Sequence, residues 1–286
     1  MTPKFLPPPY IPIAQVHGFD RIAVAIDCAA VSGPVAKLEA SCRGGMTVIQ
    51  RRLKFNPQWK ATVELYQPSA KALRLLVNDC LAEHVGALPT YAEVAVDFIF
   101  RSHRQAAVFG DYLAQRIVMR HQRQTVHVED NTTIYFARRA DVAGNKRGRV
   151  GCMYFDRPSK LASAHQGQPC VHVEIRLTGS AALSAVGIAS ASDFLTFDHL
   201  QFWASAISLY DLPAKTELGR HIGGRDDSGV SGTALRKRAE KFIRKASVDG
   251  QFFMHNAARL DRAVVRKFWQ IPLKTVMPPA QATSGD

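Results

Sequence analysis

The chain has 286 residues, of which 47% are hydrophobic and 21% are charged, and this composition excludes a disordered polyelectrolyte. It carries 37 lysines and arginines against 24 aspartates and glutamates, a formal net charge of +13. No stretch approaches about eighteen consecutive apolar residues, and the five cysteines form no CxxC pair. These features argue against a membrane span, a disulfide framework and a zinc ribbon. They predict a folded, cytoplasmic protein that binds a polyanion.

Apolar periodicity and turn residues predict alternating strands and helices in the first half of the chain. In chain order the expected elements are a proline-rich arm (1–19), a strand (20–27), a hairpin (46–55 and 60–67, turning at Asn56-Pro57), a helix (69–86, with Ser69 as N-cap), a strand (90–100) and a helix (103–118).

Further strands are expected at 125–139, 149–155 and 170–177, and the segment 190–212 looks helical. This order predicts an α+β fold with an antiparallel β-sheet core and flanking helices, in which 60–98 and 132–187 can be related βαβ-type halves. The expected domains are the arm, an α+β domain (20–210), a linker (211–232), a small basic helical element (233–270) and a disordered tail (271–286).

Three of the acids within predicted strands are candidate metal ligands. Glu93 and Asp97 are four residues apart in YAEVAVDFIF, so their side chains should project from one face. Glu174 lies in VHVEIRL, with His172 and Arg176 beside it. A hard divalent cation would explain buried carboxylates in such strands, and His172 could share it. The alternative is a solvent-facing polar side with exposed acids.

The C-terminal segment holds much of the positive charge. Residues 233–267 contain ten lysines or arginines against three acids, arranged as two amphipathic helices. A small origin-binding element is one interpretation and an ordinary solvated basic face is the other. The cations expected to contact DNA here are Arg236, Lys237, Arg238, Lys241, Arg244, Lys245, Arg266 and Lys267.

Four segments taken together, YAEVAVDF, TTIYFARRAD, MYFDRPSK and VHVEIRL, resemble the replication initiation factor family in their order and distances. These are the Rep-trans type initiators of rolling-circle plasmids and some filamentous phages. The likeness spans roughly residues 90–180. It departs from the family pattern at Tyr91, where an arginine is usual, and at Glu93, which replaces an aspartate.

The resemblance implies an enzyme that nicks one DNA strand at an origin through a tyrosine, remains joined to the 5′ phosphate and later rejoins the strand. It implies Mg²⁺ or Mn²⁺ held by Glu93, Asp97 and Glu174, and places Arg138 or Arg139 at the arginine of the family's turn. The implied partner is origin DNA, single-stranded or cruciform, with a host helicase and a homodimer as further partners. The alternative is a non-catalytic DNA-binding initiator or repressor of the same ancestry.

Tyr154 is the candidate nucleophile. An ungapped alignment puts Phe155 at the family's catalytic position, so Tyr154 would face the carboxylates only if the strand were bulged. Arg157 and Lys160 follow it and would favour its phenolate. Other cations near this strand, expected to contact DNA, are Lys146, Arg147 and Arg149, and the reserve nucleophiles are Tyr135, Tyr112 and Tyr210.

The basic segments predict salt-dependent binding of DNA. If roughly six to ten of their cations contact phosphates, affinity should fall about 10³- to 10⁵-fold between about 50 and 200 mM salt. Fluorescence anisotropy with a labelled oligonucleotide measures this slope. An affinity that does not change with salt would contradict the role given to these cations.

Overall fold

The computed structural model describes residues 10–50, 58–82, 84, 86–114, 117–119, 127–129, 133–136, 148–210 and 270–271. The predicted linker at 211–232 and the basic loop at 143–147 lie outside these residues. So do the basic element at 233–270 and the tail at 271–286, apart from two residues in a short strand.

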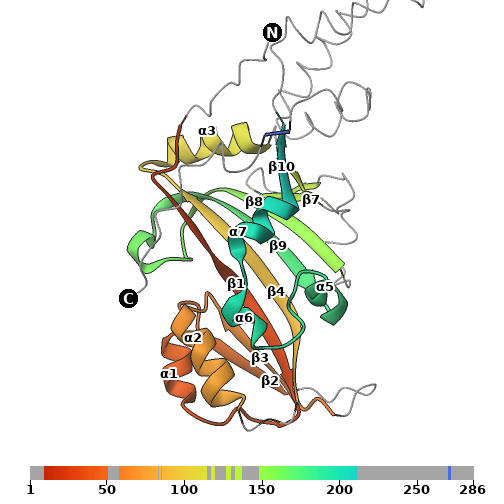
Figure 1. Ribbon diagram of the computed structural model, residues 1–286. Coiled ribbons are helices and arrows are strands. Elements are labelled where there is room, and N and C mark those ends of the chain that lie inside the picture. The colour runs from red at the N-terminus through yellow and green to blue at the C-terminus, as the bar shows by residue number, and fades with distance from the viewer. Residues whose placement is uncertain are drawn as a thin grey trace, which may run out of the picture.

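An antiparallel sheet of eight strands forms the body of the molecule and confirms the predicted α+β fold (Figure 1). The strand order is β2-β3-β1-β4-β9-β8-β7-β6. The strands are β1 (Ala14–Ile26), β2 (Met46–Gln50), β3 (Ala61–Tyr66), β4 (Ala87–Ile99), β6 (His127–Glu129), β7 (Thr133–Phe136), β8 (Gly148–Pro158) and β9 (Pro169–Thr178). The predicted hairpin is formed by β2 and β3; within the predicted strand 125–139 β6 pairs with β7, and β8 pairs with β9 where strands were expected at 149–155 and 170–177.

The helices are short and lie between strands. They are α1 (Val35–Ala40), α2 (Ala70–Arg74), the π-helical turn η1 (Leu75–Cys80), α3 (His103–Ala114), the 3-10 turn η2 (Ser163–His165), α5 (Ser180–Ser184), α6 (Asp193–Thr196) and α7 (His199–Ala206). As predicted, Ser69 caps α2, because its Oγ accepts a hydrogen bond from the Ala72 N–H at 3.1 Å. Among the described residues, no helix has the length and apolar content that crossing a membrane requires.

Several sequence-based boundaries are wrong, and the helix expected at 69–86 ends at Cys80, as α2 and η1. Strand β1 begins at Ala14, inside the predicted arm, because Ala14–Phe19 pair with β4. Helix α3 ends at Ala114, and β5 (Ile117–Met119) replaces the end of the predicted helix. The predicted helical segment 190–212 ends in β10 (Ile207–Tyr210). Strands β5 and β10 pair with each other, with β11 (Gln270–Ile271) on the other side of β10, and such long-range pairing leaves little local signal.

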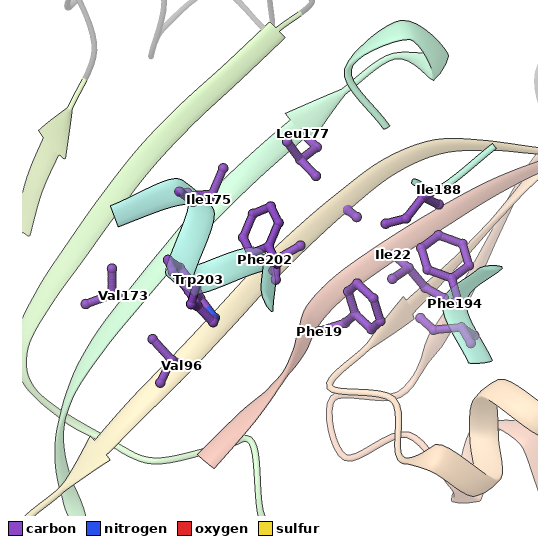
Figure 2. Close-up of a cluster of buried hydrophobic side chains, with 14 of the residues drawn as sticks. Phe19, Ile22, Val96, Val173, Ile175, Leu177, Ile188, Phe194, Phe202 and Trp203 are labelled. Carbon is purple, nitrogen blue, oxygen red and sulfur yellow. The ribbon is translucent and has the colours of Figure 1, made fainter. Parts of the chain in front are cut away.

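One face of the large sheet is apolar and carries the core. Strand alternation puts Val96 of β4 and Val173 of β9 on this face, where α7 covers them with Phe202 and Trp203 (Figure 2). Trp203 is 1% exposed. Helix α6 lies over β1 in the same layer and packs Phe194 edge-on against Phe19, with ring centroids 5.2 Å apart. The charged side chains of β4 and β9 therefore lie on the opposite face.

Two histidines lie within the apolar layer. His17 of β1 pairs with Val96, and the ring of His199 at the start of α7 lies 4.8 Å from that of Phe19. The Nδ1 atom of each imidazole is buried without a hydrogen-bond partner among the described residues. Burial lowers the pKa of both residues to about 4, and the charge of His17 lowers that of His199 further.

These imidazoles should make the fold sensitive to acid. Above the usual pKa of 6.5 both are neutral in the folded and unfolded chains, but between pH 6.5 and about 4 the unfolded chain binds protons that the folded chain does not. The free energy of unfolding should fall across this window by about 3 kcal/mol per imidazole. Urea unfolding at a series of pH values measures it. The dependence of the free energy of unfolding on pH should become weaker in His199→Gln. It should persist in the control His103→Gln, which removes an exposed imidazole. Equal pH dependence in the two variants would refute the assignment.

Candidate active site

The face of the sheet opposite α6 and α7 carries a buried polar cluster on its two central strands, β4 and β9. Glu93 and Asp97 project from β4, and their neighbours across the strand pair are Arg176 and His172. Glu174 projects from β9 between these two. The exposed fractions of Glu93, Asp97 and Glu174 are 9%, 1% and 1%. The structure thus brings the three predicted acids to one face, and their burial excludes the alternative of a solvent-facing polar side.

His172 lies between two of these carboxylates. Its Nδ1 is 2.5 Å from Asp97 Oδ1 and its Nε2 is 3.0 Å from Glu174 Oε2. Burial alone would lower the pKa of His172, but the hydrogen bonds and charges of the two acids outweigh it and raise the pKa to about 9. At neutral pH the ring is therefore an imidazolium that donates to both. Ser159 Oγ donates to the other oxygen of Asp97 at 2.6 Å.

A fourth carboxylate on this face is that of Asp20, which lies at a β-bulge in β1. Phe19 pairs with Val94 and Arg21 with Glu93, so Asp20 is the extra residue between two consecutive pairs. Its Oδ2 lies 4.0 Å from His172 Nε2, while its Oδ1 accepts from Gln67 Nε2 at 2.7 Å. Because Phe19 lies in the core, alternation puts Asp20 on the polar face, and the bulge keeps Arg21 on that face as well.

Tyr154 of β8, and not Phe155, faces the acids. The pairing runs regularly from Cys152 opposite Glu174 to Tyr154 opposite His172, and the bulge follows, before Arg157 pairs with Cys170. The Tyr154 hydroxyl lies 3.3 Å from Glu174 Oε1 and accepts a hydrogen bond from Arg176 Nη2 at 2.6 Å. The bulge also returns Arg157 to this face, where its guanidinium lies 4.7 Å from the Tyr154 ring centre and 3.9 Å from Asp20 Oδ2.

Phe155 points the other way, toward α3. It packs so closely on Gly110 that a Cβ at position 110 would overlap its ring. Helix α3 itself is anchored by Phe109, whose ring centroid is 5.4 Å from that of Phe98 of β4. The contact between Phe155 and Gly110 therefore fixes which face of β8 each of its aromatic residues occupies.

Arg176 links the tyrosine to the acids. Its Nε lies 2.7 Å from Glu174 Oε1 and 3.6 Å from Glu93 Oε1. Burial opposes ionisation of Glu174, but His172 and Arg176 outweigh it and lower its pKa to about 2. Burial and the charge of Glu174 instead raise the pKa of Glu93 to about 7, although Tyr91 donates to it at 2.5 Å. Burial and Glu174 also raise the pKa of Tyr154 above its usual range, so the phenol keeps its proton at neutral pH.

Asp20, His172 and Glu174 form the group best suited to a cation on this face. Each offers one donor atom, and these atoms lie within 4.8 Å of one another. Two carboxylates and an imidazole suit Mn²⁺, and Mg²⁺ less well because it prefers oxygen ligands. A cation there would take the place of the Nε2 proton of His172. Of the predicted ligands, Glu174 belongs to this group, Asp97 orients His172 from behind, and Glu93 pairs with Arg176 and Tyr91.

The other predicted residues lie in several places. Lys160 is exposed beyond the end of β8, and its carbonyl accepts from Arg43. Arg149 lies on the face of β8 opposite Tyr154, by alternation from its pairing with Leu177. Of the reserve tyrosines, Tyr135 pairs with Cys152 on the polar face and Tyr112 packs in α3. The side chains outside the described residues are those of Tyr210, Arg138, Arg139, Lys146, Arg147, Arg236, Lys237, Arg238, Lys241, Arg244, Lys245, Arg266 and Lys267.

Asp20 and Arg176 complete the site, although the sequence patterns do not select them as site residues; His172 was expected only as a residue that could share the cation. His172 and Arg176 alternate with Glu174 along β9, so their place on its face could be predicted, but not their burial. Asp20 carries no such signal, because the sequence does not show that β1 pairs with β4 or that Phe19 takes the core face.

Gly110→Ala tests the contact that orients β8. The new methyl group should overlap Phe155, lower the free energy of unfolding by about 1–3 kcal/mol and disturb the strand that carries Tyr154. Urea unfolding measures the loss. The matched control is Gly18→Ala, whose Cβ would meet only Leu161 at an ordinary 3.6 Å. Combining Gly110→Ala with Phe155→Leu should recover part of the loss; strictly additive effects would contradict the contact.

Comparisons with known proteins do not assign this chain to a family. No protein-family model matches it, and no curated protein is similar to it. A solved structure of a rolling circle replication initiator protein from Geobacillus stearothermophilus is similar to it with a TM-score of 0.37 and 11% sequence identity, over 70% of this chain and 89% of that chain. A similarity this low does not assign a function to the chain, and the geometry of the site is the evidence for its function.

Proposed function

We propose that this protein is a rolling-circle replication initiator that binds a DNA origin and nicks and rejoins one strand by tyrosine transesterification, with Mg²⁺ or Mn²⁺ as cofactor. The observation that carries the proposal is the position of the Tyr154 hydroxyl, between Glu174 and Arg176 and on the same face as Asp20 and His172. A nucleophile, a proton acceptor, a cation and a group of metal-binding donors are thus adjacent.

The residues have the roles that strand transfer requires. Glu174 accepts the proton of the Tyr154 hydroxyl, the phenolate oxygen attacks phosphorus, and the bond from phosphorus to the 3′ oxygen breaks. The products are a tyrosine–5′-phosphate diester and a free 3′ hydroxyl, which takes up a proton. The reverse steps rejoin the strand. Arg176, which already donates to the tyrosine oxygen at 2.6 Å, stabilises the phenolate as it forms.

Asp20, His172 and Glu174 would hold the divalent cation. Such a cation neutralises charge on the phosphoryl oxygens during displacement. Asp97 keeps the His172 ring in its orientation through the hydrogen bond to Nδ1, and Ser159 in turn donates a hydrogen bond to Asp97. Arg157 lies over the Tyr154 ring and can pair with a phosphate of the bound strand.

One assay tests the enzymatic proposal. The full chain is incubated with Mn²⁺ and 3′-labelled single-stranded oligonucleotides that tile the DNA on which the gene lies, and labelled protein is sought on a denaturing gel. The expected result is a covalent adduct that is lost completely in Tyr154→Phe. Tyr135→Phe is the matched control, since it removes another hydroxyl from the same face, and it should retain the adduct.

The second candidate is a non-catalytic DNA-binding initiator or repressor. It is favoured by the raised pKa of Tyr154 and by the pairing of Arg176 with Glu174, which together suit a purely structural tyrosine. If wild type forms no adduct on any oligonucleotide, while binding one of them tightly, the second candidate is correct. If Tyr154→Phe still forms the adduct, another residue is the nucleophile.

A further inference from the structure

A second group of metal-binding side chains lies at one end of the sheet, away from the polar face. Asp27 and Cys28 directly follow β1, and His84 precedes β4. Ile26 pairs with Ala87, so the hydrogen-bonded ladder between β1 and β4 holds these two ends of chain together. Asp20 and Asp27 are seven residues apart, about 20 Å along an extended strand, so the two groups are separate.

The three side chains converge. One oxygen of Asp27, the sulfur of Cys28 and one ring nitrogen of His84 lie within 4.8 Å of one another. Asp27 Oδ1 and His84 Nδ1 are 3.1 Å apart. This is close to the distance of about 3.3 Å between two ligands of one tetrahedral zinc ion, so a cation could replace the proton that the two atoms share.

His84 is held in place and incompletely satisfied. Its side chain is only 3% exposed, whereas that of Asp27 is 29% exposed and Cys28 is exposed to solvent. Its Nε2 is buried without a hydrogen-bond partner among the described residues, so only Nδ1 of the two ring nitrogens forms a hydrogen bond there. The result is an ordered nitrogen donor beneath two accessible ligands, which leaves a path for an ion and a coordination position for water.

We propose that Asp27, Cys28 and His84 form a binding site for one thiophilic divalent cation of the zinc type. A thiolate, an imidazole and a carboxylate together select zinc over magnesium or calcium, which prefer oxygen ligands. Binding forms a metal–sulfur bond and releases the thiol proton to solvent. The ion ties the residues after β1 to those before β4 and stabilises this end of the sheet.

Cobalt substitution tests the site without reference to DNA. The full chain, stripped with EDTA, is titrated with Co²⁺ and followed in the near ultraviolet, where thiolate-to-cobalt charge transfer reports a cysteine ligand. We expect one equivalent to give the band, Zn²⁺ to displace it, and both Cys28→Ser and His84→Gln to lose it. Cys28→Ser changes an exposed side chain and should fold, which its melting temperature without metal checks.

Cys152→Ala is the discriminating control, because Cys152 is the thiol opposite Glu174 on the polar face. It should retain the band. Absence of the band in wild type, its survival in Cys28→Ser, or its loss in Cys152→Ala would each overturn the proposal. Zn²⁺ should also raise the melting temperature of wild type but not of Cys28→Ser, and an equal rise in both would count against the site.

Discussion

The structure depends on the neutralisation of two carboxylates that are almost completely buried. Asp97 and Glu174 project from neighbouring central strands, and an unpaired charge at either position would be very costly. His172 satisfies both, with one ring nitrogen for each carboxylate. Because the contact needs residues on β4 and β9 to share a face, it also specifies the register of the pair. A slip by one residue would bury the charges among the apolar side chains beneath α7.

Two β-bulges then enlarge the site beyond what regular strands allow. The bulge in β1 keeps Arg21 on the polar face beside Asp20 while Phe19 remains in the core, and the bulge in β8 brings Arg157 to that face after Tyr154. Arg157 and Asp20 lie 3.9 Å apart. Irregularities on strands that are not neighbours in the sheet therefore converge on one point, beside His172.

The apolar face supports this arrangement. Phe155 can pack on α3 only because Gly110 has no side chain, and that contact leaves Tyr154 on the opposite face. Trp203 and Phe202 cover the centre of the sheet beneath the polar cluster (Figure 2). The site is therefore built on rigid strands, which fix its side chains more precisely than loops would, and Arg176 joins its acidic and aromatic parts.

Local sequence determined the fold class and the face on which the acids lie. Periodicity identifies β4 and β9, Ser69 marks the start of α2, and the spacing of Glu93 and Asp97 puts both on one side of a strand, since alternation is a property of any extended chain. Local sequence did not determine the strand ends that pair over long distances, and the helical pattern therefore extends into β5 and β10. Only the tertiary structure decided that Tyr154 faces the acids and that Asp20 joins them. The first outcome depends on the regular pairing of β8 with β9 and the contact between Phe155 and Gly110, and the second on the pairing of β1 with β4, all of which join residues far apart in the chain.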